Sequence, residues 1–253
     1  VPIEAVLFDT FGTVCDFYHP MRDAFARLAE SKSVDCDPGR MAIDWRTAYV
    51  FSTAAQGSHE TAFLPLQEIN RGNLLEVLAR HFPAVVSGVE IDALNAVWER
   101  LDPWPDAVEG LTRIGEHAII GPLSNGNFAD MVRLARHAGL PWDISLGSSV
   151  SGFYKPHPQT YLQSVAALRL LPAQVCMVAA HQRDLDYAAG HGMQTAFVRR
   201  PMEFGGAVKP ADPEPGKLYI DAAEIHLEGD YNYVAEDFVD LAEQLASSRA
   251  GSN

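Results

Sequence analysis

A short stretch near the start of the chain decides the fold: Ala5-Val6-Leu7-Phe8-Asp9-Thr10-Phe11-Gly12-Thr13. Its apolar run predicts a buried parallel strand over residues 6–8 that ends at Asp9. Such a strand aims the side chain at its end into the crevice at the carboxyl edge of an open α/β sheet. Asp9 is therefore placed to act as a nucleophile, and Gly12 lets backbone amides approach a bound anion.

A simpler interpretation of the same stretch is an Asp that only caps the turn after a strand. Taken alone, these residues do not decide between a cap and a nucleophile, so the rest of the chain has to supply partners for Asp9. Phe11 restricts the reactions that Asp9 could take part in, because this apolar side chain two residues after Asp9 has no proton to give to a leaving group.

The composition is that of an ordinary globular enzyme, with 47% hydrophobic and 21% charged residues among 253. This length suits one large domain or one domain that carries an insertion. The net charge of −14 argues against a nucleic-acid partner, which needs a basic surface, and it repels small anions at long range. A site for an anionic substrate therefore needs local positive charge.

The sequence gives no indication of a membrane partner or of export. No apolar run approaches the roughly eighteen residues that a spanning helix needs. The first residues lack the pattern of a signal peptide, because Asp9 interrupts their apolar run. The cysteines Cys15, Cys36 and Cys176 are scattered and odd in number, which favours neither a disulfide framework nor a zinc site. We expect a cytoplasmic protein.

Helical patterns follow the first strand, and an alternation of short apolar and helical segments follows Pro103-Trp104-Pro105. The alternation predicts an α/β fold with a Rossmann-like parallel sheet and helices on both faces. The further expected strands are 118–123, 144–146, 175–180 and 195–198. Two helices are expected to begin near Pro20 and Pro38, and further helices are expected over 66–80, 91–101, 128–138, 158–168, 184–189 and 234–246. A loop is expected over 205–216.

The helical block is predicted to be a cap domain inserted into the sheet domain. The core is expected to comprise residues 1–15 and 102–253, and the cap residues 16–101. Four segments of the core should meet at the carboxyl edge of the sheet, because each stands at a strand end or a helix start. They are residues 9–13, Ser124-Asn125-Gly126-Asn127, Tyr154-Lys155-Pro156 with Tyr161, and residues 181–184.

In their order and spacing these segments resemble the haloacid dehalogenase superfamily. Phe8-Asp9-Thr10-Phe11-Gly12-Thr13 is similar to its nucleophile loop, and Leu123-Ser124-Asn125-Gly126 is similar to its second motif. Lys155 matches its lysine, and Asp184 matches the acidic residue of its fourth motif. The resemblance covers most of the chain and implies the superfamily's α/β core with an inserted helical cap.

Most members of that superfamily are magnesium phosphatases. They carry a second Asp two residues after the nucleophile as the general acid, and a metal-binding Asp at the end of the strand before the fourth motif. Phe11 and Ala179 occupy these positions here. Because Mg²⁺ prefers several oxygen ligands, the two losses together disfavour a phosphatase. A magnesium-dependent phosphatase that uses Asp9 and a catalytically silent binding protein on the same scaffold remain the alternatives.

The chain resembles most closely the L-2-haloacid dehalogenases, whose nucleophile loop has an aromatic residue where Phe11 stands. Trp45-Arg46 matches the Trp-Arg pair of that family, and Lys155-Pro156 followed by Tyr161 matches its Lys-Pro…Tyr spacing. The resemblance implies that haloacetates and 2-halopropionates are hydrolysed without a metal or organic cofactor. Asp9 would displace the halide and form an ester, which water would hydrolyse to a 2-hydroxy acid. A homodimer is implied by the resemblance alone.

The resemblance also implies a role for each residue of the binding pocket. Arg46 and the Asn125 amide are expected to stabilise the departing halide in a pocket that holds little water. The substrate carboxylate is expected to bind the Ser124 hydroxyl and the backbone amides of Thr10 and Phe11.

Three further residues are expected to act on the nucleophile or the substrate. Lys155 should hold the Asp9 carboxylate ionised beside Asp184, since two neighbouring carboxylates raise each other's pKa. Thr13 and Tyr161 should orient the nucleophile and the substrate by hydrogen bonding.

The fourth motif departs from the family pattern. The L-2-haloacid dehalogenases carry Ser-Ser-Asn where this chain has Ala179-Ala180-His181, and Arg183 replaces the aromatic residue before Asp184. We expect His181 to position or deprotonate the water that hydrolyses the ester, because an imidazole titrates near neutral pH. The alternative is a His that only forms hydrogen bonds within its loop.

Overall fold

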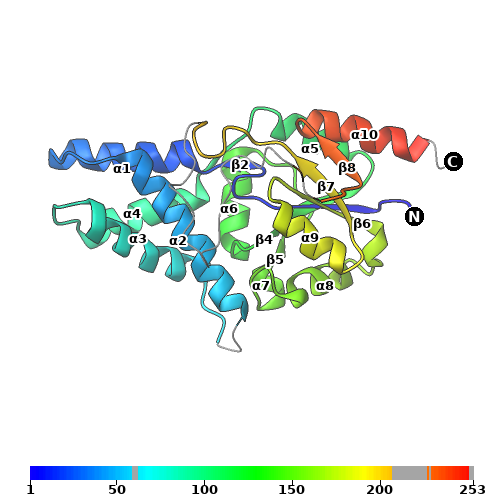
Figure 1. The fold of residues 1–253 in the computed structure, drawn as a ribbon, viewed down its shortest axis with the longest axis horizontal. Helices are drawn as coiled ribbons and strands as arrows, with labels where there is room; N and C mark the ends of the chain where they lie inside the picture. Colours follow the sequence, from blue (N-terminus) through cyan, green and yellow to red (C-terminus); the bar gives the residue numbers. More distant parts are fainter. Residues whose placement is uncertain (59–61, 207–226, 228, 251–253) are drawn as a thin grey trace.

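The computed structural model describes residues 1–58, 62–206, 227 and 229–250. Within these residues a six-stranded sheet has the order β5-β4-β1-β6-β7-β8, and each pair of neighbours is parallel, which confirms the α/β fold (Figure 1). The four residues of β1 are buried, and this strand lies between β4 and β6. The strands are β1 (Ala5–Phe8), β4 (Ile119–Ser124), β5 (Leu146–Gly147), β6 (Val175–Ala179), β7 (Gln194–Val198) and β8 (Tyr233–Ala235).

Helices cover both faces of the sheet, and the side chains of β1 alternate between them. Val6 and Phe8 belong to an apolar cluster that includes residues of α5 and α10, whereas Ala5 and Leu7 belong to one that includes residues of α8 and α9. A strand buried on both sides explains the continuous apolar run at the start of the chain. The helices are α5 (Ala107–Gly115), α6 (Phe128–Ala138), α7 (Ser148–Ser151), α8 (Pro158–Ala167), α9 (Gln182–Gly190) and α10 (Phe238–Ala250).

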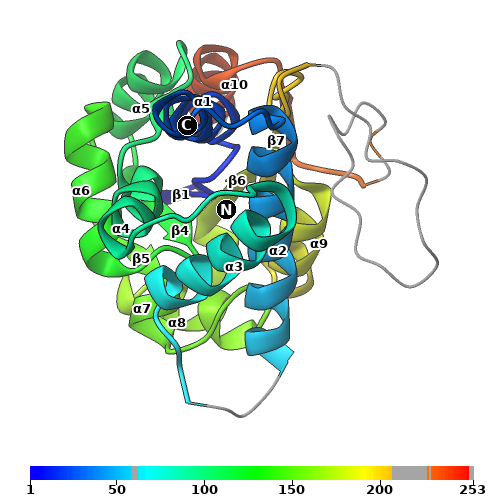
Figure 2. The same cartoon turned by 90° about the vertical axis from the view of Figure 1, so that its left-hand side faces the viewer.

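The helices between β2 and β3 pack on one another to one side of the sheet (Figures 1 and 2). The chain leaves the sheet through β2 (Cys15–Asp16) and returns through β3 (Asp102–Pro103), which pair in antiparallel fashion. These strands adjoin the limits predicted for the inserted segment 16–101, and the division into core and cap stays a prediction. The helices are α1 (Tyr18–Lys32), α2 (Pro38–Ser58), α3 (Leu66–His81), α4 (Gly88–Asn95) and the 3₁₀ helix η1 (Ala96–Glu99).

Each predicted strand and helix has a counterpart in the structure. The strand predicted over 144–146 overlaps β5 only at Leu146, and the helix predicted over 91–101 is α4 followed by η1. A helix over 234–246 is wrong at its start, because Val234 lies in β8 and pairs with Phe197 of β7. The helix begins only at Phe238, after Asp237 has accepted the Asp240 amide hydrogen in the manner of an N-cap. The sequence pattern also did not predict the strands β2, β3 and β8 or the α-helices α5 and α7.

Of the loop predicted over 205–216, residues 207–216 lie outside the described part of the chain. In the described part, none of the helices has the length and hydropathy needed to cross a membrane.

Candidate active site

Polar side chains from four segments meet at the carboxyl edge of the sheet. Asp9 follows β1, Asn125 follows β4, and Lys155 precedes α8, while His181 and Asp184 lie where β6 leads into α9. Together with residues of α2 they line a cavity of about 150 Å³. The parallel topology thus brings together residues that lie far apart in the sequence, as the strand-end argument predicts.

Three side chains bind the Asp9 carboxylate. The Thr13 hydroxyl donates to Oδ2 over 2.8 Å, and Nδ1 of His181 lies 3.1 Å from the same oxygen. Nζ of Lys155 donates to Oδ1 over 3.2 Å. Burial alone would raise the pKa of Asp9, but Lys155 and then His181 outweigh it and hold this pKa well below its usual range. Asp9 is therefore ionised, as a nucleophile has to be.

Lys155 links Asp9 to a second buried carboxylate. Its Nζ lies 2.6 Å from Oδ2 of Asp184, whose Oδ1 accepts the Tyr161 hydroxyl over 2.6 Å. Burial lowers the pKa of Lys155, but Asp184 and Asp9 raise it more, so the ammonium group stays charged. Burial raises the pKa of Asp184 against the opposing effect of Lys155. The Asn125 side-chain oxygen accepts the Lys155 backbone amide over 2.8 Å and fixes the lysine segment.

Arg46 extends from α2 into the same cavity and is only 4% exposed. Its Nη2 donates to the Phe11 carbonyl over 3.2 Å, and its guanidinium carbon lies 4.7 Å from the centre of the Tyr49 ring. Nε and Nη1 are buried and have no hydrogen-bond partner among the described residues. A buried polar group without a partner is costly, so these two donors are suited to an anionic ligand.

Three of the predicted substrate-binding residues do not line this cavity with their side chains. The Phe11 ring packs edge-on against Tyr49 and Trp98 and lines a neighbouring cavity. The Ser124 hydroxyl accepts the Gly126 amide over 3.2 Å, and Thr10 is fully buried. Their expected role in binding the substrate carboxylate therefore stays a prediction.

Sequence reasoning missed several residues that contribute to the site, among them Tyr49 and Glu203. Tyr49 follows Arg46 by one helical turn, and this spacing could have identified it as a lining residue. Glu203 comes after β7, and its Oε1 lies 2.9 Å from Nε2 of His181. Its side chain is only 4% exposed. No motif in the sequence marks this carboxylate, so the three-dimensional arrangement was needed to find it.

Comparison with known proteins gives the family. The family model described as "haloacid dehalogenase-like hydrolase" matches residues 3–192. The chain belongs to the haloacid dehalogenase-like hydrolases. The curated (S)-2-haloacid dehalogenase of Xanthobacter autotrophicus is 28% identical over 213 residues, which cover 78% of this chain and 76% of that protein.

Two solved structures place the chain more narrowly within these hydrolases. The defluorinating L-2-haloacid dehalogenase Rha0230 is 39% identical with a TM-score of 0.86, covering 96% of this chain and 95% of that one. The L-2-haloacid dehalogenase PA0810 is 33% identical with a TM-score of 0.84, covering 97% of this chain and 99% of that one. The chain is thus a haloacid dehalogenase homologue and a hydrolase that acts on carbon–halide bonds.

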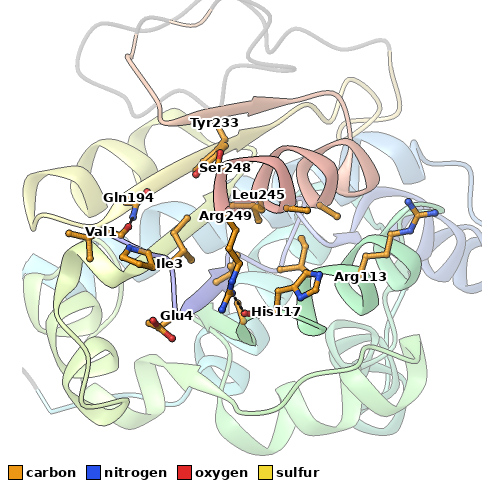
Figure 3. Close-up of a pocket in the computed structure, with 16 residues that line it drawn as sticks. Val1, Ile3, Glu4, Arg113, His117, Gln194, Tyr233, Leu245, Ser248 and Arg249 are labelled. Carbon is orange, nitrogen blue, oxygen red and sulfur yellow. Dashed lines mark hydrogen bonds between the residues drawn. The ribbon is translucent and has the colours of Figure 1, made fainter. Parts of the chain in front are cut away.

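This haloacid dehalogenase homologue has a second cavity, of about 270 Å³, at the opposite end of its sheet. Its lining includes residues that precede β1 and β4, the first residue of β7 and the end of α10, as Figure 3 shows for Ile3, His117, Gln194 and Arg249. Arg249 is engaged there by a hydrogen bond to the His117 carbonyl. Asp9 and its hydrogen-bond partners lie at the other edge of the sheet and take no part in this cavity.

Proposed function

We propose that this chain hydrolyses short 2-haloalkanoic acids through an ester formed on Asp9. The observation that carries the proposal is that the ionised Asp9 carboxylate lies in the same cavity as Arg46, which has N–H groups without a hydrogen-bond partner among the described residues. Asp9 lines a cavity of about 150 Å³, into which Arg46 brings two buried N–H groups. A space of this size holds a molecule of a few heavy atoms, such as a haloacetate or a 2-halopropionate. Since the relative Rha0230 is described as defluorinating, fluoroacetate is included among the proposed substrates.

Two anions have to be bound in the proposed reaction, the substrate carboxylate and the departing halide. The unpartnered Nε and Nη1 of Arg46, together with the Asn125 amide, are proposed to hold the halide as negative charge develops on it. The Ser124 hydroxyl and the backbone amides of Thr10 and Phe11 are proposed to hold the substrate carboxylate.

The hydrogen bonds of Asp9 suggest which of its oxygens attacks. Oδ2 accepts hydrogen bonds from Thr13 and His181, whereas Oδ1 accepts one from Lys155. Oδ1 therefore retains more of its lone-pair capacity and is proposed to attack the carbon that carries the halogen. A bond forms between Oδ1 and this carbon while the carbon–halogen bond breaks, and the bonding electron pair leaves with the halide.

The second half of the proposed reaction regenerates Asp9. Water attacks Cγ of the Asp9 ester and gives one proton to Asp184, the carboxylate that remains charged in the cavity once Asp9 is esterified. The bond between Cγ and Oδ1 breaks, and the departing alkoxide takes the proton from Asp184. The products are a 2-hydroxy acid and a carboxyl group on Asp9, which ionises by losing the second water proton.

The proposed cap and core supply different parts of this site. Arg46 and Tyr49 come from residues 16–101, whereas the other named groups come from residues 1–15 and 102–253. We propose that the two parts have to be closed on each other for catalysis, as in other enzymes with lids. A homodimer and a cytoplasmic location remain expectations.

Halide release is the direct test. Wild type and the isosteric variant Asp9→Asn are compared on chloroacetate, fluoroacetate and 2-chloropropionate with EDTA present. We expect halide release that persists in the chelator and is lost in Asp9→Asn. No halide from any of these substrates would refute the proposal, and release of phosphate from phosphate esters in the presence of Mg²⁺ would support a phosphatase instead.

Isotope labelling tests the ester separately. In a single turnover in H₂¹⁸O, the proposed mechanism places ¹⁸O in the peptide that contains Asp9, because water attacks Cγ and the product leaves with Oδ1. Direct attack of water on the substrate would instead place the label in the hydroxy acid and leave the peptide unlabelled, which would exclude the ester.

A further inference from the structure

The carboxylate of Glu203 is built into the nucleophile loop. Gly12 has φ +92°, and a Cβ at this position would lie 2.0 Å from Oε1 of Glu203, so the carboxylate packs directly against the backbone of residue 12. Arg200, three residues earlier, donates to the Thr13 carbonyl over 2.8 Å and holds the Glu203 segment onto the loop. On the other side of Glu203, Phe204 packs edge-on against Phe17. These contacts fix the carboxylate at one position.

His181 lies between two carboxylates. Its Nδ1 is 3.1 Å from Oδ2 of Asp9, and its Nε2 is 2.9 Å from Oε1 of Glu203. Ionised carboxylates only accept hydrogen bonds, so both ring nitrogens have to donate, and only the protonated ring has two N–H groups. Burial lowers the pKa of His181, but Glu203 and then Asp9 raise it well above its ordinary value.

The charges around the ring agree with a protonated His181. Asp9, Glu203 and Asp184 are acidic, and Lys155 and Arg46 are basic; Arg46 Nη2 lies 3.9 Å from Glu203. A protonated His181 therefore brings the net charge of this buried cluster to zero. The exposed side chain of Arg183, at the rim of the cavity, is in contact with Tyr187. When Asp9 becomes a neutral ester, Glu203 remains to hold the charge on the ring.

We propose that Glu203 is a positioning residue that keeps His181 protonated and aimed at Oδ2 of Asp9, so that His181 and Thr13 together stabilise this oxygen while the ester is hydrolysed. The inference rests on the proposed ester at Asp9. With Oδ1 esterified, Oδ2 is the carbonyl oxygen, and it takes the negative charge when water bonds to Cγ. Two hydrogen-bond donors already aimed at that oxygen form an oxyanion hole. A protonated ring does not accept a proton from water, so this role differs from that of a base.

The test separates the two half-reactions. Wild type, Glu203→Gln and His181→Ala are mixed with chloroacetate in rapid-quench experiments, which give the first-turnover release of halide and the decay of the Asp9 ester by mass spectrometry. We expect halide release to stay within about threefold of wild type, while ester decay slows roughly tenfold in Glu203→Gln and roughly a hundredfold in His181→Ala. The matched control is Glu236→Gln, an exposed carboxylate that pairs with Arg199, and it should behave as wild type.

The pH dependence of ester decay distinguishes a donor from a base. For a protonated donor, decay slows as the pH rises through the pKa of His181, and Glu203→Gln moves this fall to lower pH. For a base, decay accelerates with rising pH, and Glu203→Gln moves the rise to lower pH. The second pattern, or unchanged decay in Glu203→Gln, would overturn the inference. If no ester forms in wild type, the proposed function itself has failed.

A measurement on the resting wild-type protein does not depend on the variants. The ¹⁵N chemical shifts of the His181 ring are expected to report a doubly protonated imidazole between about pH 6 and 8, where an ordinary histidine loses its proton. A neutral ring throughout this range would refute the inference even if both variants failed to fold.

Discussion

Replacing Arg46 by lysine tests how the proposed pocket binds anions. The substitution retains the positive charge but removes the planar fork of donors, so an ammonium group would stand in place of Nε and Nη1. Both atoms are buried without a partner among the described residues. A hydrogen bond from a charged donor contributes about 1.5–3 kcal/mol, and lysine can replace at most one of the two in this geometry. We therefore expect kcat/KM to fall about ten- to a hundredfold.

The assay is steady-state halide release from chloroacetate by folded protein, checked by circular dichroism. Arg40→Lys is the matched control, because Arg40 lies on the same helix, pairs with Asp44 and has a side chain that is 54% exposed. We expect this control to retain wild-type kcat/KM. A value for Arg46→Lys within about threefold of wild type would refute the assignment of the two free donors to anion binding.

Three further predictions concern the loop that holds Asp9. Gly12→Ala should lower the free energy of unfolding by about 1–3 kcal/mol, measured by urea titration, because alanine is strained at φ +92° and its Cβ would collide with Glu203; unchanged stability would contradict this packing. Arg200→Ala should lower the free energy of unfolding by about 3–5 kcal/mol in the same assay, because it leaves Asp106 without its buried partner. A loss below about 1 kcal/mol would contradict the proposed importance of the Arg200–Asp106 pair. The pKa of Asp9 is lower in the folded than in the unfolded chain, so its ionisation stabilises the fold above about pH 4 and this contribution is lost as the pH falls further. The stability difference between wild type and Asp9→Asn should therefore shrink between about pH 5 and 3, and a constant difference would show that Asp9 is not held ionised.

The sequence was sufficient to predict which edge of the sheet holds the candidate site and which polar side chains reach this edge from the ends of strands. Asp9, Asn125 and His181 each follow an apolar run within two residues, and the parallel topology leaves one place where such residues can meet. Arg46 was found only because a neighbouring tryptophan completed a known pair; nothing in the periodicity of α2 separates it from an exposed arginine such as Arg40.

The position of Glu203 and the packing of the Phe11 ring could not be predicted, because both depend on contacts with residues far away in the sequence. Glu203 belongs to a segment without periodicity, and its position is set by Arg200 and by the space that Gly12 leaves. The backbone amide of Phe11 was expected to bind the substrate, and the sequence did not predict that the Phe11 ring packs against Tyr49 and Trp98, where edge-to-face packing of aromatic rings is favourable. In both cases side chains distant in the sequence decide the outcome.

The hydrogen bond between Arg200 and the Thr13 carbonyl affects when, during folding, the loop of Asp9 reaches its final geometry. The loop of Asp9 comes before Arg200 in the chain, yet the Thr13 carbonyl accepts a hydrogen bond from Arg200. The Arg200 guanidinium in turn pairs with Asp106 and stacks 4.5 Å from the centre of the Phe238 ring. Contacts of such long sequence separation form late in folding. Asp9 is thus synthesised before the residues that anchor its loop and gains its final geometry only when α10 has docked, so a nascent chain that still lacks residues 200–250 does not carry the finished candidate site.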